Sequence, residues 1–174
     1  TGTGGFVLEA ALSNRETYGV DLDSLMIEGA QKNLDWAMPA SEAKLLLGDA
    51  TLLPEVIPIH AHQRIAGFVL DPPYGRNSQG SLDHAELIEA VLLSSRNIAS
   101  ENAGLVLILP IHPFGEFPDE ALTDDAELEL LHGEWSEIES TFSKTGWHIN
   151  NRWVEHVHAS LGRLILHATI VPQD

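Results

Sequence analysis

A carboxylate, two prolines and an aromatic ring follow one another at residues 71–74, which read D-P-P-Y after the apolar run RIAGFVL. Pro72 and Pro73 have φ fixed near about −65° and lack a backbone N–H, so Asp71 and the carbonyls beside it can accept hydrogen bonds without competing donors. An exocyclic amine has two N–H bonds to offer, and the Tyr74 ring gives a flat base a stacking surface worth about 1–3 kcal/mol. The pattern predicts a site for a nucleobase amine. A rigid turn is the alternative, but it explains the prolines and Gly75 and not the acid and the ring.

A glycine cluster stands at the beginning of the sequence, where Gly2, Thr3, Gly4 and Gly5 precede a run with helical apolar spacing. Glycines at the entrance of a helix let a ligand approach the backbone and direct free N–H groups toward it. The cluster therefore predicts a ligand-binding turn, with a tight strand-to-helix turn as the alternative. Its spacing is GxGG and not the GxGxxG that packs a dinucleotide pyrophosphate against a helix.

Two further acids end expected strands. Asp21 lies 17 residues after Gly4, close to the spacing at which an acid accepts hydrogen bonds from ribose hydroxyls. The alternative for Asp21 is an N-cap of the helix that begins at Asp23 or Ser24. Asp49, in GDAT, is placed to accept from the adenine amine, although Asp is also common at strand-to-helix turns. Together with the GxGG turn, these acids favour a pocket for S-adenosylmethionine (AdoMet).

The apolar spacing predicts the helices and strands that position these residues. A helix of about three turns is expected after the glycines, and an amphipathic helix over 24–37 that packs through Leu25, Ile27, Ala30 and Leu34. Strands are expected to end at the three acids. The later elements are expected as a short helix or loop over 51–63, a loop over 75–81, a helix over 82–100, a strand over 103–110, an insertion or lid-like connection over 112–135, a helix over 136–145, and strands over 147–158 and 161–170 joined at Ser160, Leu161 and Gly162.

Strands and helices alternate up to Pro110, and two adjacent strands close the chain. The predicted fold is therefore α/β, with a Rossmann-like, mostly parallel open sheet, helices on both faces and a C-terminal antiparallel hairpin. In such sheets ligands bind outside the carboxyl ends of the strands, which is where the glycine turn and the three acids fall. Because the sequence begins inside the glycine turn, we expect the first strand of the sheet to be missing from this chain.

Composition limits the class of protein. A length of 174 residues with 44% hydrophobic residues suffices for one domain with a buried core, and the absence of cysteine excludes disulfides and thiolate metal sites. No apolar run approaches the roughly 20 residues of a membrane span, so we expect a cytoplasmic protein. The net charge of −17 argues against a phosphate-binding surface, and predicts either an acidic, salt-adapted surface or a separate basic module.

The motifs resemble those of the AdoMet-dependent amino-methyltransferases, whose fourth motif is (D/N/S)PP(Y/F/W). Over residues 1–110, the blocks GTGGFVLEAAL, GVDLDSLMIEGAQKNL, GDAT and DPPYGRNS look most like the tRNA guanine-N2 methyltransferases that act at tRNA position ten. The resemblance implies a Rossmann-like methyltransferase catalytic domain over 1–174, and a THUMP-type RNA-binding domain that is absent from the chain. It implies tRNA as a partner through that module, and a partner subunit is an additional expectation.

The resemblance also implies a role for each motif residue. The glycine turn would line the methionine end of AdoMet, Asp21 would bind its ribose, and Asp49 with Ala50 would contact its adenine. Asp71 would also contact the cofactor. Asp71 and Pro72 would hold the guanine N2 amine, and Tyr74 would stack on or flank the target base; with Pro73 these residues form the implied catalytic motif. Arg76 would contact a substrate phosphate, for which a surface ion pair is an equal alternative.

The expected reaction is in-line transfer of the AdoMet methyl group to the amine, with Asp71 orienting the amine and removing its proton. No metal is expected, and the pairs His60/His62 and His156/His158 are interpreted as solvated or core histidines. D-P-P-Y also serves rRNA guanine-N2 and DNA adenine-N6 or cytosine-N4 methyltransferases, which remain alternatives. A catalytically silent subunit with the same fold is the alternative from another class.

Overall fold

A computed structural model describes residues 1–72, 84–113, 118, 120–123 and 126–171. The chain divides into two compact units, Thr1–His62 and Gln63–Asp174. None of the helices in the described part of the chain combines the length and the apolar composition that a bilayer crossing demands.

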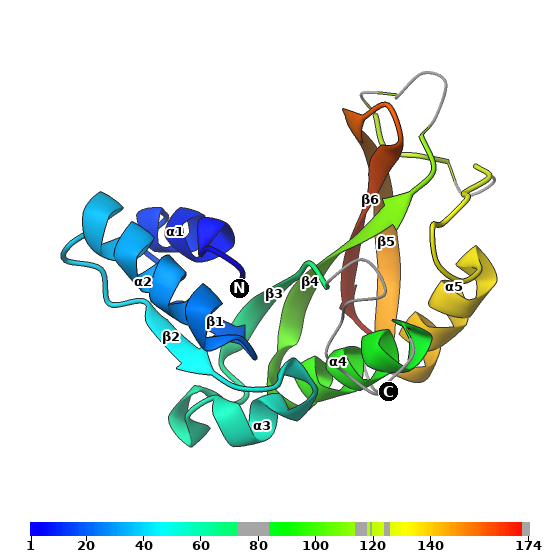
Figure 1. Ribbon diagram of the computed structural model, residues 1–174. Coiled ribbons are helices and arrows are strands. Elements are labelled where there is room, and N and C mark those ends of the chain that lie inside the picture. The colour runs from blue at the N-terminus through cyan, green and yellow to red at the C-terminus, as the bar shows by residue number, and fades with distance from the viewer. Residues whose placement is uncertain (73–83, 114–117, 119, 124–125, 172–174) are drawn as a thin grey trace. The chain divides into compact units, whose positions relative to one another are not determined.

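The first unit holds a parallel pair of strands with helices packed on it (Figure 1, blue to cyan). Strands β1 and β2 pair in register from Tyr18↔Lys44 to Asp21↔Leu47. Its elements are α1 (Gly5–Leu12), β1 (Tyr18–Asp21), α2 (Ser24–Ala37), β2 (Lys44–Leu47), the 3-10 helix η1 (Ala50–Leu52), α3 (Leu53–Val56) and the 3-10 helix η2 (Ile59–Ala61).

Helix α2 has the predicted bounds but packs through fewer residues than predicted. Ala30 and Leu34 are buried and Ile27 is half-buried, whereas Leu25 is 67% exposed. At 3.6 residues per turn, Leu25 points about 140° away from Ala30 around the helix, while Leu34 and Ile27 lie within about 60° of it. The prediction that Leu25 packs was therefore wrong.

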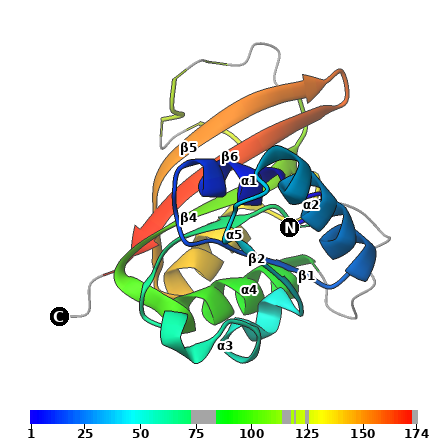
Figure 2. The same ribbon diagram turned by 90° about the vertical axis from the view of Figure 1, so that its left-hand side faces the viewer.

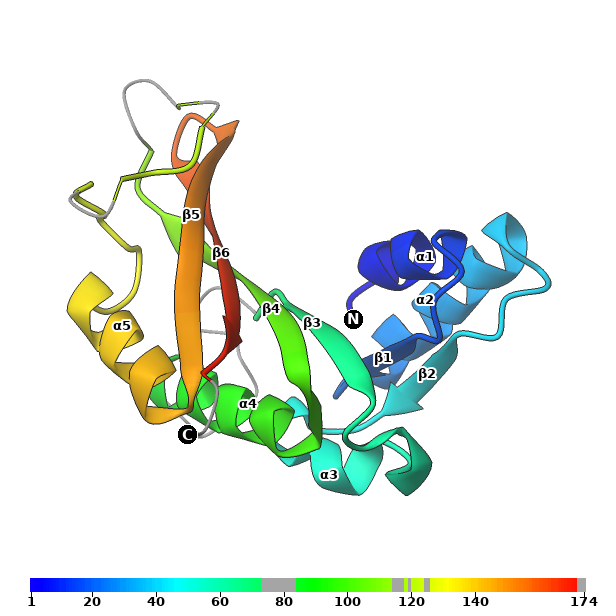
Figure 3. The same cartoon turned by 180° about the vertical axis from the view of Figure 1, so that it is seen from behind.

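The second unit is a four-stranded mixed sheet in the order β3-β4-β6-β5 (Figure 3). Strand β3 is parallel to β4, and β6 is antiparallel to both of its neighbours, β4 and β5. The predicted hairpin is present, but its second strand lies between β4 and β5. The elements are β3 (Ile65–Leu70), α4 (His84–Ile98), β4 (Ala99–Ile111), α5 (Trp135–Lys144), β5 (Trp147–His158) and β6 (Leu161–Ile170).

Several predicted boundaries shift by a few residues, and α5 begins and ends one residue before its predicted bounds. The helix expected over 82–100 ends at Ile98 within the described residues, and β4 begins at the next residue because Ala99 already pairs with Ile65 of β3. The hairpin turn lies one residue earlier than expected, because His158 pairs with Leu161 and leaves a two-residue loop.

One face of this sheet forms the core with α4 and α5. Trp147 is fully buried at its centre, where its indole N–H donates to the Leu92 carbonyl at 3.1 Å and its ring meets Phe68 edge to face at 6.1 Å. A buried indole needs such a partner for its N–H. The core also contains Ile88, Leu105, Leu107, Leu109, Phe142, Leu164 and Leu166.

The connection expected as an insertion over 112–135 packs along the second sheet. It returns to β4, where Ile111 bridges Leu130, and it reaches β5, where the Leu122 N–H donates to the Arg152 carbonyl at 2.7 Å. The buried Arg152 guanidinium hydrogen-bonds the Thr123 carbonyl and stacks over the Trp135 ring at 5.0 Å. The described part of this connection is thus tied to both strands.

Candidate functional site

The glycine turn is built by backbone conformations that favour glycine. Gly2 has φ +53° and Gly4 has φ +89°, both in the left-handed region. A Cβ on Gly4 would lie 2.9 Å from the Cβ of Ala30, so the approach of the turn to α2 also requires glycine there. A Cβ on Gly2 or Gly5 would meet nothing within 4 Å, which leaves open space beside these two residues.

Asp21 holds this turn against the end of β1. Its Oδ2 accepts from the Gly2 N–H at 2.8 Å and lies 3.2 Å from the Thr1 ammonium, and its Oδ1 accepts from the Asp23 N–H at 3.0 Å. The cap of α2 is Asp23, whose Oδ1 accepts from the Leu25 N–H at 2.8 Å. The alternative of Asp21 as the N-cap was therefore wrong, and its carboxylate instead orients the glycine turn, while its role toward a ribose stays a prediction.

The charge of Asp21 is stabilised by the same contacts. Burial alone would raise the pKa of Asp21, but the hydrogen bonds from the Asp23 and Gly2 N–H groups lower it, and the pKa lies below its ordinary value. Asp21 is thus a fixed carboxylate at neutral pH. A carboxylate has about four acceptor positions, and its contacts leave room for a hydroxyl donor.

Two residues beside this turn were not predicted. The Asn33 side chain of α2 donates to the Thr3 carbonyl at 2.9 Å and so fixes the middle of the turn. Leu22, directly after Asp21, is 69% exposed. No sequence signal links Asn33 to a residue thirty positions earlier. The place of Leu22 directly after an expected strand, by contrast, could have indicated it from the sequence.

Asp49 lies at a strand-to-helix turn, which was the alternative given for it from the sequence. Its Oδ1 accepts from the Thr51 N–H and from the Thr51 hydroxyl, both at 2.8 Å, and it caps η1, which begins at Ala50. Both bonds end on Oδ1, so Oδ2 is the carboxylate oxygen through which Asp49 can accept from an amine.

The D-P-P-Y motif is described in part. Asp71 follows β3 directly, is exposed, and stands one residue beyond the pairing of Leu70 with Leu107 of β4, while Pro72 is half-buried. The structure thus confirms that the motif's acid lies at the carboxyl end of a parallel strand. Pro73, Tyr74 and Arg76 lie outside the described residues, and their roles stay predictions.

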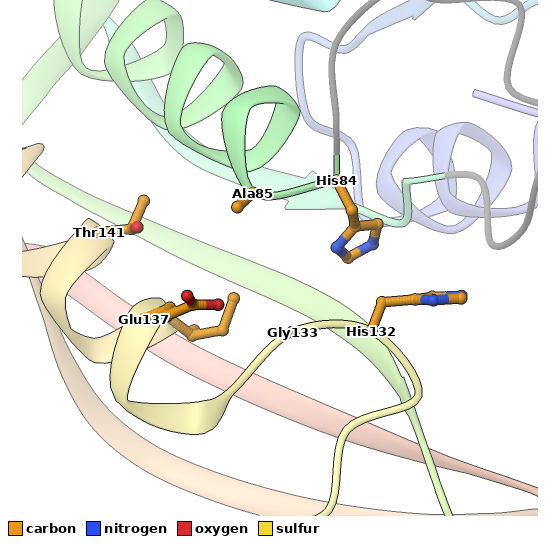
Figure 4. A pocket seen from close by; sticks show the side chains of 7 residues that line it. His84, Ala85, His132, Gly133, Glu137 and Thr141 are labelled. Atoms are coloured by element: carbon orange, nitrogen blue, oxygen red, sulfur yellow. The ribbon is translucent and has the colours of Figure 1, made fainter.

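The second unit also has a small cavity of about 220 Å³ that the sequence did not predict (Figure 4). The rings of His84 and His132 lie 5.4 Å apart across it. Glu137 lies on the same wall as His132 (Figure 4) and accepts from the Glu134 N–H, which completes the capping box of α5. The cavity is lined by His84, Ala85, His132, Gly133, Glu137, Ile138 and Thr141, none of which belongs to a predicted motif.

The histidine pairs have local partners. A ring nitrogen of His62 bonds the Ile57 carbonyl at 2.9 Å, and a ring nitrogen of His158 lies 3.3 Å from the Ser160 amide. Within the described ranges, no three side chains of the metal-binding types gather in one place. The absence of a metal from the proposed chemistry stays a prediction.

The fold is shared with a solved structure. The crystal structure of magnesium protoporphyrin IX methyltransferase from Synechocystis PCC 6803 with bound SAM matches 98% of this chain and 66% of its own, with a TM-score of 0.65 and 13% sequence identity. The predicted α/β fold with C-terminal antiparallel strands is therefore confirmed, and the structure shows it with a mixed sheet, in a fold shared with this methyltransferase.

The family follows from the sequence. Residues 1–135 match the family model of the RMKL-like methyltransferase domain, UPF0020, and the chain belongs to this family.

Two relatives carry the same name. The tRNA (guanine(10)-N2)-dimethyltransferase of Pyrococcus abyssi is 35% identical over 97 residues, 56% of this chain and 28% of that protein. The enzyme of that name from Methanothermobacter thermautotrophicus is 26% identical over 164 residues, 94% of this chain and 40% of that protein. The chain thus spans well under half the length of both relatives.

Proposed function

We propose that the protein transfers a methyl group from AdoMet to the exocyclic N2 amine of a guanine in tRNA. The observation that carries this proposal is the carboxylate Asp71, exposed at the end of β3 and followed by Pro72, in a chain whose relatives are named for guanine-N2 methylation. The acid and the proline together provide hydrogen-bond acceptors where an amine would be held.

The first unit fits AdoMet. The open space beside Gly2 and Gly5 allows a ligand to approach the backbone, and Asp21 is an ionised acceptor for ribose hydroxyls. The exposed Leu22 side chain gives an apolar surface for a purine ring, and Oδ2 of Asp49 is an acceptor for its amine. When bound, AdoMet supplies a methyl group already activated on a sulfonium.

The second unit provides the acceptors for the substrate. Asp71 and the Pro72 carbonyl would accept the two N–H bonds of the amine, which orients its lone pair for in-line attack. Asp71 would then take up the proton that the nitrogen loses. A ring from Tyr74 would stack on the base, and Arg76 would contact a phosphate.

The substrate would have to present an unstacked base, because a base inside a helix cannot reach such acceptors. We propose that an RNA-binding module, of the THUMP type expected from the resemblance, presents the tRNA. A tRNA substrate also implies the cytoplasm as the place of the reaction.

Transfer of label from tritiated AdoMet to tRNA, rRNA and duplex DNA tests the proposal. We expect label in tRNA as N2-methylguanosine. Asp71→Ala should abolish transfer while calorimetry still detects AdoMet binding, and Asp35→Ala, which removes an exposed acid from α2, should transfer as the unaltered chain does.

Two results would contradict the proposal. Label in DNA alone would exclude the tRNA reaction and favour an adenine or cytosine amine. Absence of AdoMet binding to the unaltered chain would favour a silent subunit.

A further inference from the structure

The β5–β6 hairpin has an unusual charge for this chain. Residues 147–170 contain one acid, Glu155, against two arginines and four histidines. The segment is thus formally +1 with neutral histidines, in a chain of net charge −17, so the other 150 residues carry −18. A polyanion is repelled by an acidic surface and approaches where that repulsion is weakest.

One face of the hairpin is not covered by α4 and α5, and it carries Arg163 and Glu155, whereas Arg152 is buried on the opposite face. Directly opposed residues in an antiparallel pair share a face, and Asn151 opposes His167, Trp153 opposes Ile165, and Glu155 opposes Arg163. The intervening residues of both strands are buried toward α4 and α5. We call this set the hairpin face: Asn151, Trp153, Glu155, Arg163, Ile165 and His167. Figure 2 shows the two strands side by side along their length.

Arg163 has charge and hydrogen-bonding capacity that the described residues do not use. Its side chain is half-buried, its Nε is buried without a hydrogen-bond partner among the described residues, and it forms no ion pair with any of them. A buried polar atom without a partner is rare in native proteins and points to a group that is absent from the structure. A guanidinium matches a phosphate in geometry as well as in charge.

The neighbours of Arg163 are suited to the rest of a nucleotide. Trp153 is half-buried and supplies an aromatic ring on the same face, and Asn151 is exposed and carries amide donors. Base–aromatic stacking together with a phosphate contact is the usual chemistry of single-stranded nucleic-acid binding.

We propose that the hairpin face binds RNA, with Arg163 on a backbone phosphate and Trp153 stacked on a neighbouring unpaired base. The inference rests on the proposed function in so far as tRNA is the RNA concerned. It assigns the contact to a part of the chain with few acids. The binding is independent of AdoMet and of Asp71.

Fluorescence anisotropy of a labelled, unmodified tRNA transcript with the full chain, without AdoMet, tests the proposal. Arg163→Gln should weaken binding about tenfold at 50 mM KCl. It should also make the negative slope of log affinity against log salt less steep by about one. Arg163→Lys should retain the salt slope. The matched control is Arg15→Gln, which removes the same charge from an exposed loop and should bind as the unaltered chain does.

Circular dichroism of each variant verifies the fold, and a change in salt slope would not result from a purely structural role. The proposal is overturned if the unaltered chain does not bind tRNA, if Arg163→Gln and Arg15→Gln bind equally, or if polyglutamate competes as well as tRNA. The last result would assign the face to an acidic protein.

The outcome is separable from that of the proposed function. Binding through Arg163 without methyl transfer would support this inference and contradict the proposed reaction. Methyl transfer to tRNA with an unchanged KM in Arg163→Gln would support the proposed reaction and contradict this inference.

Discussion

Replacement of Gly4 tests how the turn and α2 are joined. Gly4→Ala places an L-residue at φ +89°, which costs roughly 1–2 kcal/mol, and inserts a methyl 2.9 Å from the Ala30 Cβ, which costs a further 1–3 kcal/mol by overpacking. We expect a total loss of about 2–5 kcal/mol in the free energy of unfolding, measured by urea titration followed by circular dichroism.

Two neighbouring glycines are matched controls. Gly2→Ala has the same conformational problem at φ +53° but no contact within 4 Å, so its loss should be about 1–2 kcal/mol. Gly5→Ala is helical and meets nothing, so its stability should be unchanged or slightly higher. Both variants should nonetheless bind AdoMet more weakly in calorimetry, because their methyl groups enter the open space proposed for it.

A double-mutant cycle isolates the contact. Ala30→Gly should cost about 1 kcal/mol by helix propensity alone, and should cost less, or stabilise, in the Gly4→Ala background because it removes the atom that is approached too closely. The reasoning would be refuted if Gly4→Ala lost no more stability than Gly2→Ala, or if the two changes were additive.

Three other perturbations have expected outcomes. The pKa of Asp21 is lower in the folded state, so the unfolded state binds more protons at low pH. The stabilising contribution of Asp21 is complete above the unfolded pKa of about 3.9 and is lost as pH falls through the folded pKa. The stability gap between the unaltered chain and Asp21→Asn, from urea midpoints at pH 2–7, should therefore shrink only at the acid end. Trp147→Phe should cost about 2 kcal/mol in urea titration, because it leaves a cavity and loses the bond to Leu92, whereas Trp36→Phe, at a side chain 86% exposed, should stay within about 0.5 kcal/mol. Asp23→Ala should cost about 1 kcal/mol through loss of the α2 cap, and an unchanged melting temperature would contradict that assignment.

Local signals in the sequence predicted local structure well. Helix α2 and strands β5 and β6 have the predicted bounds, because helical and alternating apolar spacing were clear in each. The position of β6 between β4 and β5 was not predictable in this way. Two strands that are adjacent in the sequence form the same hairpin whether the first or the second of them lies at the edge of the sheet. That order depends on pairings across more than fifty residues, such as Leu107 with Leu166.

The candidate site shows the same division. The placement of Asp21, Asp49 and Asp71 at strand ends followed from the sequence, because each acid terminates an apolar run. The role of Asp23 as the cap of α2 did not follow from the sequence, because Asp21 also precedes the helix closely. Asn33, which bonds the glycine turn from another helix, had no sequence signal.

The place of β6 in the sheet has a consequence for synthesis of the protein on the ribosome. Strand β5 is made first, yet its partner in the sheet is β6, and β4 also lacks its antiparallel neighbour until β6 is present. The nascent chain therefore exposes two unpaired strand edges until about residue 170 has left the exit tunnel, when one strand completes both ladders. A chain that terminates before Leu161 should accordingly be a substrate for chaperones and proteases and not a smaller folded protein.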